Sequence, residues 1–315
     1  MALNSSCKGK VRLSRKLKKK WEGEVINAEG NWYVWNGVYW QSKKEIFIKQ
    51  DIAFEIYDFH HESAKMHVVN SVYQMLAFFF LTDSSFFKNK MRNCINFQNG
   101  ILLVQDNPIL IPHNKDYRLC SVLNYNYQPD AFPSPLLQTE LLNLVGHKNR
   151  NLNLLRAAIR RAIQPCRALQ AGFWIFGPPG SGKSTFTSWI KRLLGQNGAE
   201  FSCAKSNLFD RSRLRDASAI ILSEGETFSS ETSRFLKTLI GRDEIIYHVK
   251  HQQIYDTFSS EAVVFITSNF DLGSCSPSVQ DPGLMDRLFE IEFPNVLVNS
   301  KIDFLECLDK ILLHS

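Results

Sequence analysis

The second half of the chain alternates between short apolar runs and segments with a helical pattern. The apolar runs lie at residues 172–176, 219–222, 263–267 and 289–293. A helical pattern follows the first run over residues 185–194. Short buried strands that alternate with helices are typical of an α/β domain with a mostly parallel sheet. We therefore predict such a domain over residues 171–315.

The first half has another pattern, rich in aromatic and turn residues. Residues 31–40 read as a β-hairpin, because Asn36-Gly37 suits the positive-φ positions of a tight turn. A helical pattern follows over residues 63–81, and Asn99-Gly100 marks another turn. These features predict a smaller α+β domain that precedes the parallel sheet.

The two predicted domains are flanked or separated by segments of different composition. The predicted parts are a basic tail at 1–22, the α+β domain at 23–135, a helical linker at 136–170 and the α/β domain at 171–315. The boundary at 135 follows a stretch, residues 125–135, that contains three prolines.

The formal net charge of +6 belongs to the predicted tail. Eight basic residues and no acidic ones lie between Lys8 and Lys20, and the remainder of the chain has 29 basic and 31 acidic residues. Three interpretations of this tail remain open. It can hold nucleic-acid phosphates, act as an organelle-targeting segment, or simply be solvated.

Overall composition argues against a membrane or secreted protein. The hydrophobic fraction of 44% and the charged fraction of 22% are ordinary for a globular protein. The longest apolar run, residues 72–81, is half the length of a membrane-spanning helix. The seven cysteines are odd in number and never form C-x-x-C, so we expect neither a zinc site nor a disulfide framework. This cysteine usage favours a reducing compartment.

The clearest chemical motif begins where the first apolar run ends. The motif G-x-x-x-x-G-K-[ST] is matched at every fixed position by Gly177, Pro178, Pro179, Gly180, Ser181, Gly182, Lys183 and Ser184. Glycines allow backbone amides to converge on a phosphate, and the following helix adds a partial positive charge. We expect Lys183 to reach the β- and γ-phosphates, Ser184 to bind Mg²⁺ and Thr185 to complete the contacts. The predicted fold is therefore a P-loop NTPase of AAA+-like type, with ATP and Mg²⁺ as cofactors.

Polar residues after the later apolar runs supply candidates for hydrolysis. Glu224 is the first acid past residues 219–222, and we predict that it binds Mg²⁺ and polarises water, with Glu226 as the reserve. Asn269 is expected to orient the water or sense the γ-phosphate, and Arg287 to act as an arginine finger on a neighbouring subunit's ATP. The alternatives are an ordinary strand-end acid, a turn asparagine and a surface arginine.

A basic and aromatic stretch lies between the acid and the asparagine. It follows a predicted helix that ends with Gly241 as its cap. The candidate DNA-binding residues are Tyr247, His248, Lys250 and His251. Cations interleaved with aromatic residues suit a loop that grips single-stranded DNA through phosphate contacts and base stacking. The alternative is an exposed hairpin that has no ligand.

In this order, the motifs resemble the superfamily 3 helicases of viruses, phages and plasmids. The likeness is strongest to the helicase half of poxvirus- and phage-type primase-helicases. Residues 236–243 follow that family's pattern Leu-Lys-x-Leu-x-Gly-x-Asp, and residues 248–251 occupy the place of its basic hairpin. Asn269 resembles the family's sensor, and Arg287 ahead of residues 291–293 resembles its finger and final strand.

The resemblance extends into the first half of the chain. Segments similar to the region that precedes the motor lie at residues 35–40, 96–103, 111–113 and 127–131. The resemblance implies a replicative DNA helicase of a viral, plasmid or organellar element. It further implies a homo-hexameric ring around one DNA strand, ATP hydrolysis between subunits and a primase or replication initiator as partner, with no membrane contact.

Two departures from the family pattern support an alternative function. Asp286 replaces the first of two arginines that the family often has at the finger, and His248 stands where an arginine is usual. Both changes favour an ATP-binding DNA-binding or initiation factor without motor activity. A P-loop kinase is a further alternative, but it would need an acceptor pocket and a lid in place of residues 237–243 and the basic hairpin.

Overall fold

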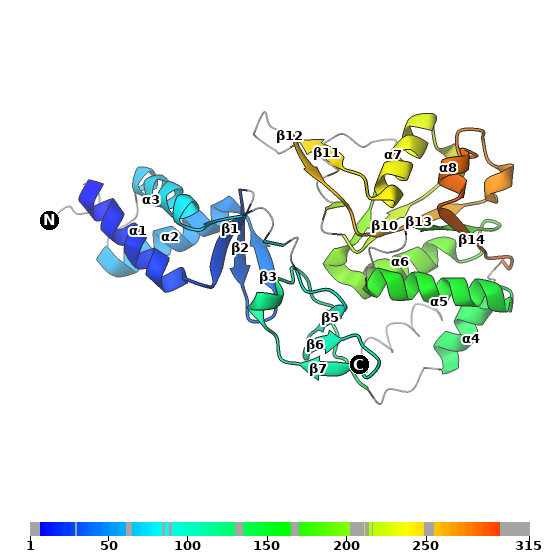
Figure 1. Cartoon of the computed structure of the whole chain (residues 1–315), viewed down its shortest axis with the longest axis horizontal. Coiled ribbons are helices and arrows are strands. Elements are labelled where there is room, and N and C mark those ends of the chain that lie inside the picture. The colour runs from blue at the N-terminus through cyan, green and yellow to red at the C-terminus, as the bar shows by residue number, and fades with distance from the viewer. Residues whose placement is uncertain are drawn as a thin grey trace. The chain divides into compact units, whose positions relative to one another are not determined.

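A computed structural model of the chain forms two compact units, Met1–Val122 and Leu123–Ser315 (Figure 1). The structure describes residues 7–28, 30–60, 65–83, 86–87, 90–129, 135–164, 170–201, 211, 214–215, 217–248 and 255–296. The division between the units precedes the boundary expected at residue 135. The helices expected as a linker therefore belong to the second unit.

The first unit begins with a folded helix where a basic tail was expected. Helix α1 (Cys7–Trp21) buries Leu13 and Leu17, whose exposed fractions are 5% and 1%. It packs against α3 (Met66–Phe79), where the Ser14 hydroxyl lies 3.3 Å from the Met75 sulfur. Apolar residues four positions apart place a hydrophobic stripe on one side of the helix despite its many charges. The prediction of a basic tail was wrong for residues 7–21, because it rested on their charge and not on the four-residue spacing of their apolar positions.

A four-stranded sheet follows in the order β3-β2-β1-β4. Its strands are β1 (Val25–Ala28), β2 (Asn31–Trp35), β3 (Trp40–Lys43) and β4 (Leu81–Thr82). The predicted hairpin at 31–40 is confirmed as β2 paired antiparallel with β3. The Asn36 side-chain oxygen accepts hydrogen bonds from the Val38 and Tyr39 amides at 3.0 and 2.9 Å. Helix α2 (Glu45–His60) contacts α3 and β2.

A second, three-stranded antiparallel sheet completes the first unit. It is formed by β5 (Cys94–Phe97), β6 (Gly100–Leu103) and β7 (Ile109–Ile111). The expected turn lies between β5 and β6, and a Cβ on Gly100 would lie 2.6 Å from the Ile111 carbonyl oxygen. The buried Asn96 amide donates to the Val38 and Ser121 carbonyls at 3.1 and 2.9 Å, which fixes this sheet against the first hairpin.

The second unit contains the predicted parallel sheet, in the order β14-β8-β13-β10-β9. Its strands are β8 (Gly172–Phe176), β9 (Gly198–Glu200), β10 (Ala219–Leu222), β13 (Val263–Ser268) and β14 (Leu288–Glu292). All neighbouring strands run parallel. The α/β class and the four strands predicted from apolar runs are confirmed. The edge strand β9 was not predicted, because it is short and contains no apolar run.

Helices cover both faces of this sheet (Figure 1). They are α5 (Asn149–Ile163), α6 (Lys183–Leu194), α7 (Ser230–Gly241) and the short α8 (Pro282–Met285), whereas α4 (Pro135–Leu144) packs on α5. Helix α5 buries Leu152 and Leu155 and contacts β13, β14 and α6. It therefore supports the sheet, although it was expected to be part of a linker. Within the described residues, no helix combines the length and apolar character needed to cross a bilayer.

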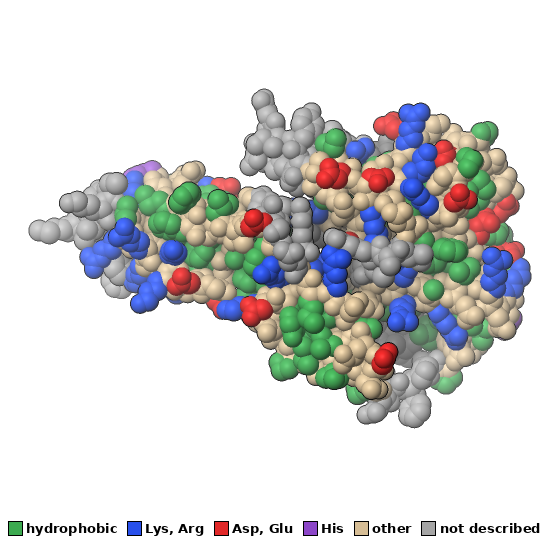
Figure 2. All heavy atoms as spheres, in the orientation of Figure 1, with side chains coloured by type: hydrophobic (Ala, Val, Ile, Leu, Met, Phe, Trp, Pro, Cys, Tyr) green, Lys and Arg blue, Asp and Glu red, His purple; other side chains and the backbone are tan. Residues whose placement is uncertain are grey.

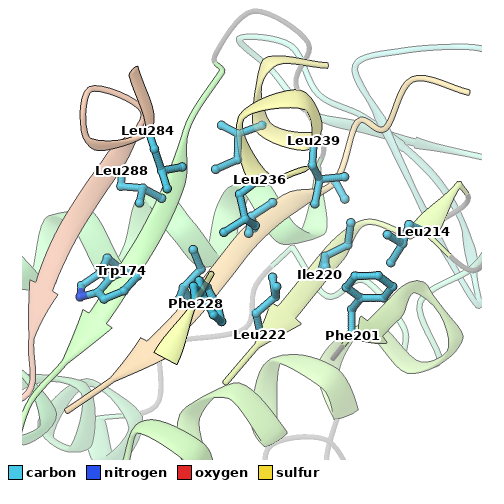
Figure 3. Close-up of a cluster of buried hydrophobic side chains, with 14 of the residues drawn as sticks. Trp174, Phe201, Leu214, Ile220, Leu222, Phe228, Leu236, Leu239, Leu284 and Leu288 are labelled. Atoms are coloured by element: carbon cyan, nitrogen blue, oxygen red, sulfur yellow. The ribbon is translucent and has the colours of Figure 1, made fainter. Parts of the chain in front are cut away.

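The main core of the second unit lies between the sheet and α7 (Figure 3). Trp174 and Leu222 from the strands pack with Leu236 and Leu239 from α7, and Leu284 and Leu288 join them, all with exposed fractions of 8% or less. Because both faces of the sheet are covered, its strands are almost continuously apolar. Polar side chains are therefore concentrated at the strand ends.

Candidate nucleotide site

The loop between β8 and α6 has the conformation that the phosphate-binding motif requires. Gly177 has φ +153°, and a Cβ at this position would lie 2.1 Å from the Phe293 carbonyl oxygen, so a side chain cannot fit. Gly180 and Gly182 have φ values of +83° and +88°, which favour glycine. Gly182 is the N-cap of α6, so the loop delivers its backbone directly to the start of a helix.

Lys183 is folded back over this loop. Its Nζ donates hydrogen bonds to the carbonyl oxygens of Gly177 at 2.6 Å and Pro178 at 2.9 Å. Burial lowers the pKa of the Lys183 ammonium below its usual value, and the charge of Glu226 acts in the opposite direction. A buried cation whose partners are carbonyl oxygens can exchange them for the oxygens of a phosphate.

Glu224 lies at a sharp turn immediately after β10. It has φ +58° and begins the 3₁₀ turn Gly225–Thr227. The turn is tight because Gly225 lies against the sheet, where a Cβ would come within 2.4 Å of the Trp174 ring. The Glu224 side chain is exposed, and within the described residues it makes no hydrogen bond or ion pair.

The reserve acid, Glu226, is the one that meets the predicted sensor. Asn269 donates to the Glu226 carboxylate from its side-chain amide at 2.9 Å and from its backbone N–H at 3.4 Å. These residues meet because β10 and β13 are adjacent and parallel, with Leu222 opposite Ile266. Glu226 also acts electrostatically on Lys183. The structure therefore brings Glu226 and Asn269 together at the strand ends beside the loop that carries Lys183, and it leaves Glu224 at the exposed side of the turn.

The loop that carries Asn269 is held in place from the core. The Trp174 indole N–H donates to the Phe270 carbonyl oxygen at 2.9 Å, and the Phe270 N–H donates to the buried Ser268 hydroxyl at 3.0 Å. A tryptophan of β8 thus fixes both neighbouring elements of the site. It packs against Gly225 before Glu226 and anchors the backbone that follows Asn269.

Arg287 lies at the opposite end of the sheet from the phosphate loop. Its carbonyl oxygen accepts from the Gly172 N–H at 2.8 Å, at the amino end of β8. A five-residue strand spans about 16 Å, so this guanidinium cannot reach the phosphate loop of its own chain. Its Nη1 instead donates to the Lys237 carbonyl oxygen at 2.7 Å, near the end of α7. A role at ATP would therefore require the site of another subunit.

The end of α7 differs from the expectation for Gly241. Gly241 is the last helical residue, and the left-handed C-cap is Arg242, with φ +61°. Gly241 lies close to the end of the Arg287 side chain, since a Cβ there would lie 2.7 Å from Nη1 of Arg287. Lys237 pairs with Asp281, the N-cap of α8, at 3.0 Å. The block at 236–243 thus ties α7 to the segment that carries Arg287.

The predicted basic hairpin is present as two antiparallel strands. Strand β11 (Ile245–His248) pairs with β12 (Tyr255–Phe258), with Ile245 opposite Phe258. Of the candidate DNA-binding residues, Lys250 and His251 lie outside the described residues. Tyr247 and His248 lie in β11, and their side chains are likewise outside the description. DNA contact by this hairpin stays a prediction.

Fold and loop together define a mixed α/β protein with a P-loop-like domain and a smaller α+β unit before it. Residues 11–145 match the family described as D5 N terminal like, and residues 175–281 match a family of unknown function, DUF5906. No curated protein matches the chain. The loop at residues 177–184, both acids and Asn269 thus lie in the region that matches this family of unknown function.

Solved structures of the C-terminal region of NrS-1 have a similar fold. Its A-form apo structure matches with a TM-score of 0.55 and 13% identity, over 94% of this chain and 66% of that one. A second A-form apo structure of the same region gives a TM-score of 0.52 and 14% identity, over 95% and 66%. The present chain thus spans about two thirds of the NrS-1 region. At this identity, the likeness concerns the fold.

Proposed function

We propose that this protein is an ATP-dependent DNA motor of the superfamily 3 helicase type that acts in the replication of a viral, plasmid or organellar element. The observation that carries this proposal is the hydrogen bond from Asn269 to Glu226 at the ends of β13 and β10, beside the loop that carries Lys183. The D5 N terminal like match and the fold shared with the NrS-1 region support the proposal. The resemblance of the sequence motifs to primase-helicases is an independent line of support.

The residues of the loop fit a nucleoside triphosphate. Gly180 and Gly182 give the loop its left-handed turns, and Lys183 offers an ammonium whose partners are loop carbonyls. Lys183 would bind the β- and γ-phosphates, and Ser184, in the first turn of α6, would bind Mg²⁺. The metal would supply charge neutralisation at the phosphates.

Hydrolysis requires a base beside the γ-phosphate. We assign this role to Glu226, because Asn269 donates two hydrogen bonds to its carboxylate. The charge of this carboxylate also acts on the pKa of the Lys183 ammonium. Asn269 would orient the attacking water together with this carboxylate. Glu224, exposed at the same turn, is the candidate for a further Mg²⁺ ligand.

Coupling to DNA would pass through α7. The helix receives a hydrogen bond from Arg287 at the Lys237 carbonyl, and β11 of the hairpin begins four residues after α7 ends. In a homo-hexamer, Arg287 would neutralise charge at a neighbour's ATP. A movement of Arg287 as the neighbour hydrolyses its ATP would alter the hydrogen bond to the Lys237 carbonyl. It would thereby shift the end of α7 and the hairpin that follows it.

The test is the ATPase rate of the full chain, with and without single-stranded DNA, for the wild type and for Lys183→Ala. We expect DNA-stimulated turnover in the wild type and a loss of at least about 10³-fold in the variant, since the lysine stabilises the transferring phosphoryl group. Strand displacement by the wild type would then separate a helicase from a DNA-stimulated ATPase.

ATP binding without turnover would instead support an initiation or DNA-binding factor that binds ATP but has no motor activity. Asp286 at the finger and His248 in the hairpin favour this second candidate, because each replaces an arginine that the family often has. A phosphorylated small-molecule product would indicate a kinase.

A further inference from the structure

Helix α1 presents a row of cations on the side opposite its buried stripe. Leu13, Ser14 and Leu17 are buried, whereas Arg12, Arg15 and Lys19 are exposed. Residues spaced by three, four and seven positions lie on one face of a helix. The row from Arg12 to Lys19 is therefore about 10 Å long. Figure 2 shows Lys and Arg side chains gathered over this end of the first unit.

The lysines at the margins of the buried stripe are used by the fold, and the row is not. Lys18 lies over the Phe79 ring at 5.6 Å, and Lys20 pairs with Glu55. Within the described residues, no salt bridge or hydrogen bond involves the side chains of Arg12, Arg15 or Lys19. The fold thus occupies the marginal cations and leaves the central ones available.

The rest of the first unit does not extend this charge. Residues 21–122 contain 9 Lys or Arg and 11 Asp or Glu, so they are slightly acidic. Like charges on neighbouring helical turns repel one another, which costs about 0.2–0.5 kcal/mol a pair. Burial of Leu13 and Leu17 is what holds the helix. Within the described residues, no ion pair or hydrogen bond uses the side-chain cations of the row, and an anionic partner is the ligand they suit.

A lipid surface does not fit this helix as a partner, because an amphipathic helix binds a membrane by inserting its apolar face. Here that face is covered by α3, as the contacts of Ser14 with Met75 and of Lys10 with Ser71 show. A phosphodiester backbone needs no apolar insertion. It carries one charge about every 3.4 Å of a strand, so a 10 Å row meets several phosphates. Arginine suits phosphate through its planar, forked donors.

We propose that the row formed by Arg12, Arg15 and Lys19 is a binding site for the phosphodiester backbone of nucleic acid, with no preference for sequence. The site is distinct from the β11–β12 hairpin and belongs to the unit that precedes the sheet. It does not depend on ATP hydrolysis. The site holds nucleic acid whether the second unit acts as a motor or only binds nucleotide.

The test is the affinity of the nucleotide-free full chain for dye-labelled 30-nucleotide DNA, single-stranded and duplex, measured by fluorescence anisotropy at several salt concentrations. The variant is Arg12→Gln with Arg15→Gln and Lys19→Gln. We expect its affinity for the single strand at 0.1 M salt to fall on the order of 10- to 100-fold, and the salt slope to decrease by about 2. Turnover of ATP without DNA should be unchanged.

A matched control removes the same charge from another helix. Arg150, Arg156 and Arg160 are exposed on α5 in the second unit. Their simultaneous change to Gln should leave the affinity within about twofold and the slope unchanged. Unaltered circular dichroism and thermal unfolding of both triple variants would exclude loss of folding as the cause.

Three outcomes would overturn the assignment. They are an unchanged affinity in the α1 variant, an equal loss in the α5 control, and wild-type binding to phosphatidylserine vesicles that the α1 variant loses while its oligonucleotide binding persists. Failure of the motor proposal would look different. It would be an absence of turnover in the wild type, and it would leave these anisotropy measurements unaffected.

Discussion

Lys183 in the second unit and the cationic row of α1 in the first use positive charge in opposite ways. Lys183 is 9% exposed, hydrogen-bonded to loop carbonyls and lowered in pKa by burial. Arg12, Arg15 and Lys19 are exposed and without partners among the described residues. A buried cation with fixed partners selects one phosphate position, whereas an exposed row accepts any phosphate chain.

The difference predicts how each region responds to substitution. At the loop and the neighbouring strand ends, a single isosteric substitution should remove most of the proposed ATPase activity, because each side chain there has one fixed set of partners. On α1, the effect should be graded and should depend on salt, because each cation contributes separately.

The strongest test of the fixed site compares its two acids. Glu226→Gln should lower the proposed ATPase rate by about 10²–10⁴-fold, because it removes a base that Asn269 holds in place. Glu224→Gln is isosteric and lies two residues away, so it is a matched control with a smaller expected loss. The measurement is steady-state phosphate release at saturating ATP. A larger loss in the Glu224 variant would reverse our assignment.

The anchoring of α1 can be broken without changing its charge. Leu17→Ala should lower the free energy of unfolding by about 2–5 kcal/mol, because the side chain is 1% exposed against α3. It should also weaken nucleic-acid binding, since the row depends on the docked helix. Lys19→Ala, at an exposed position of the same helix, should change stability by about 0.5 kcal/mol or less.

Urea denaturation followed by tryptophan fluorescence measures both variants. Trp21, Trp32, Trp35 and Trp40 lie in the first unit and report on it directly. Equal stabilities for Leu17→Ala and the wild type would mean that α1 does not depend on this contact, and the cationic row would then lack a fixed platform.

The smallest expected effect concerns the ion pair between α7 and α8. The hydrogen bond from Lys237 lowers the pKa of the Asp281 carboxyl below its usual value. A carboxyl with a lowered folded-state pKa stabilises the fold above its unfolded pKa, near 3.9, and this contribution is lost as the pH falls through the folded value. Asp281→Asn should thus be slightly less stable than the wild type at pH 7 and equal to it at strongly acidic pH.

Thermal unfolding of the two proteins between pH 2 and pH 7 measures this difference. Lys237→Gln is the matched control, because it removes the partner and should give the same pH dependence. A stability difference that persists unchanged below pH 3 would assign the effect to the N-cap hydrogen bond from the Leu284 N–H to Asp281, 3.2 Å long, and not to the charge.

Sequence patterns predicted the second unit better than the first. The apolar runs identified β8, β10, β13 and β14, since a strand covered on both faces must be apolar throughout. The loop motif located the turn at Gly177 for a similar local reason. In the first unit, residues 1–22 were predicted to be a tail from their charge, and the docking of α1 on α3 was not predicted.

The motif and the strand ends supplied the candidate site residues, but they did not show which of these residues contact one another. Lys183 and Asn269 were placed by motif and by strand ends, but Glu224 was preferred to Glu226 from its position along the chain. Position along the chain predicts which way a side chain faces only while the strand continues, and β10 ends at Leu222. Beyond it, Gly225 turns against Trp174, and this contact decides which acid faces Asn269.

Local sequence patterns were enough to predict the α/β class, the glycine-rich turn after β8, the first hairpin and the polar residues at the strand ends, because each depends on periodicity or on a turn that only certain residues form. Which acid meets Asn269, and why α1 is a folded helix, followed only from the tertiary structure. These features depend on contacts between segments far apart in the chain, such as Glu226 with Asn269 and Ser14 with Met75. No local pattern records such contacts.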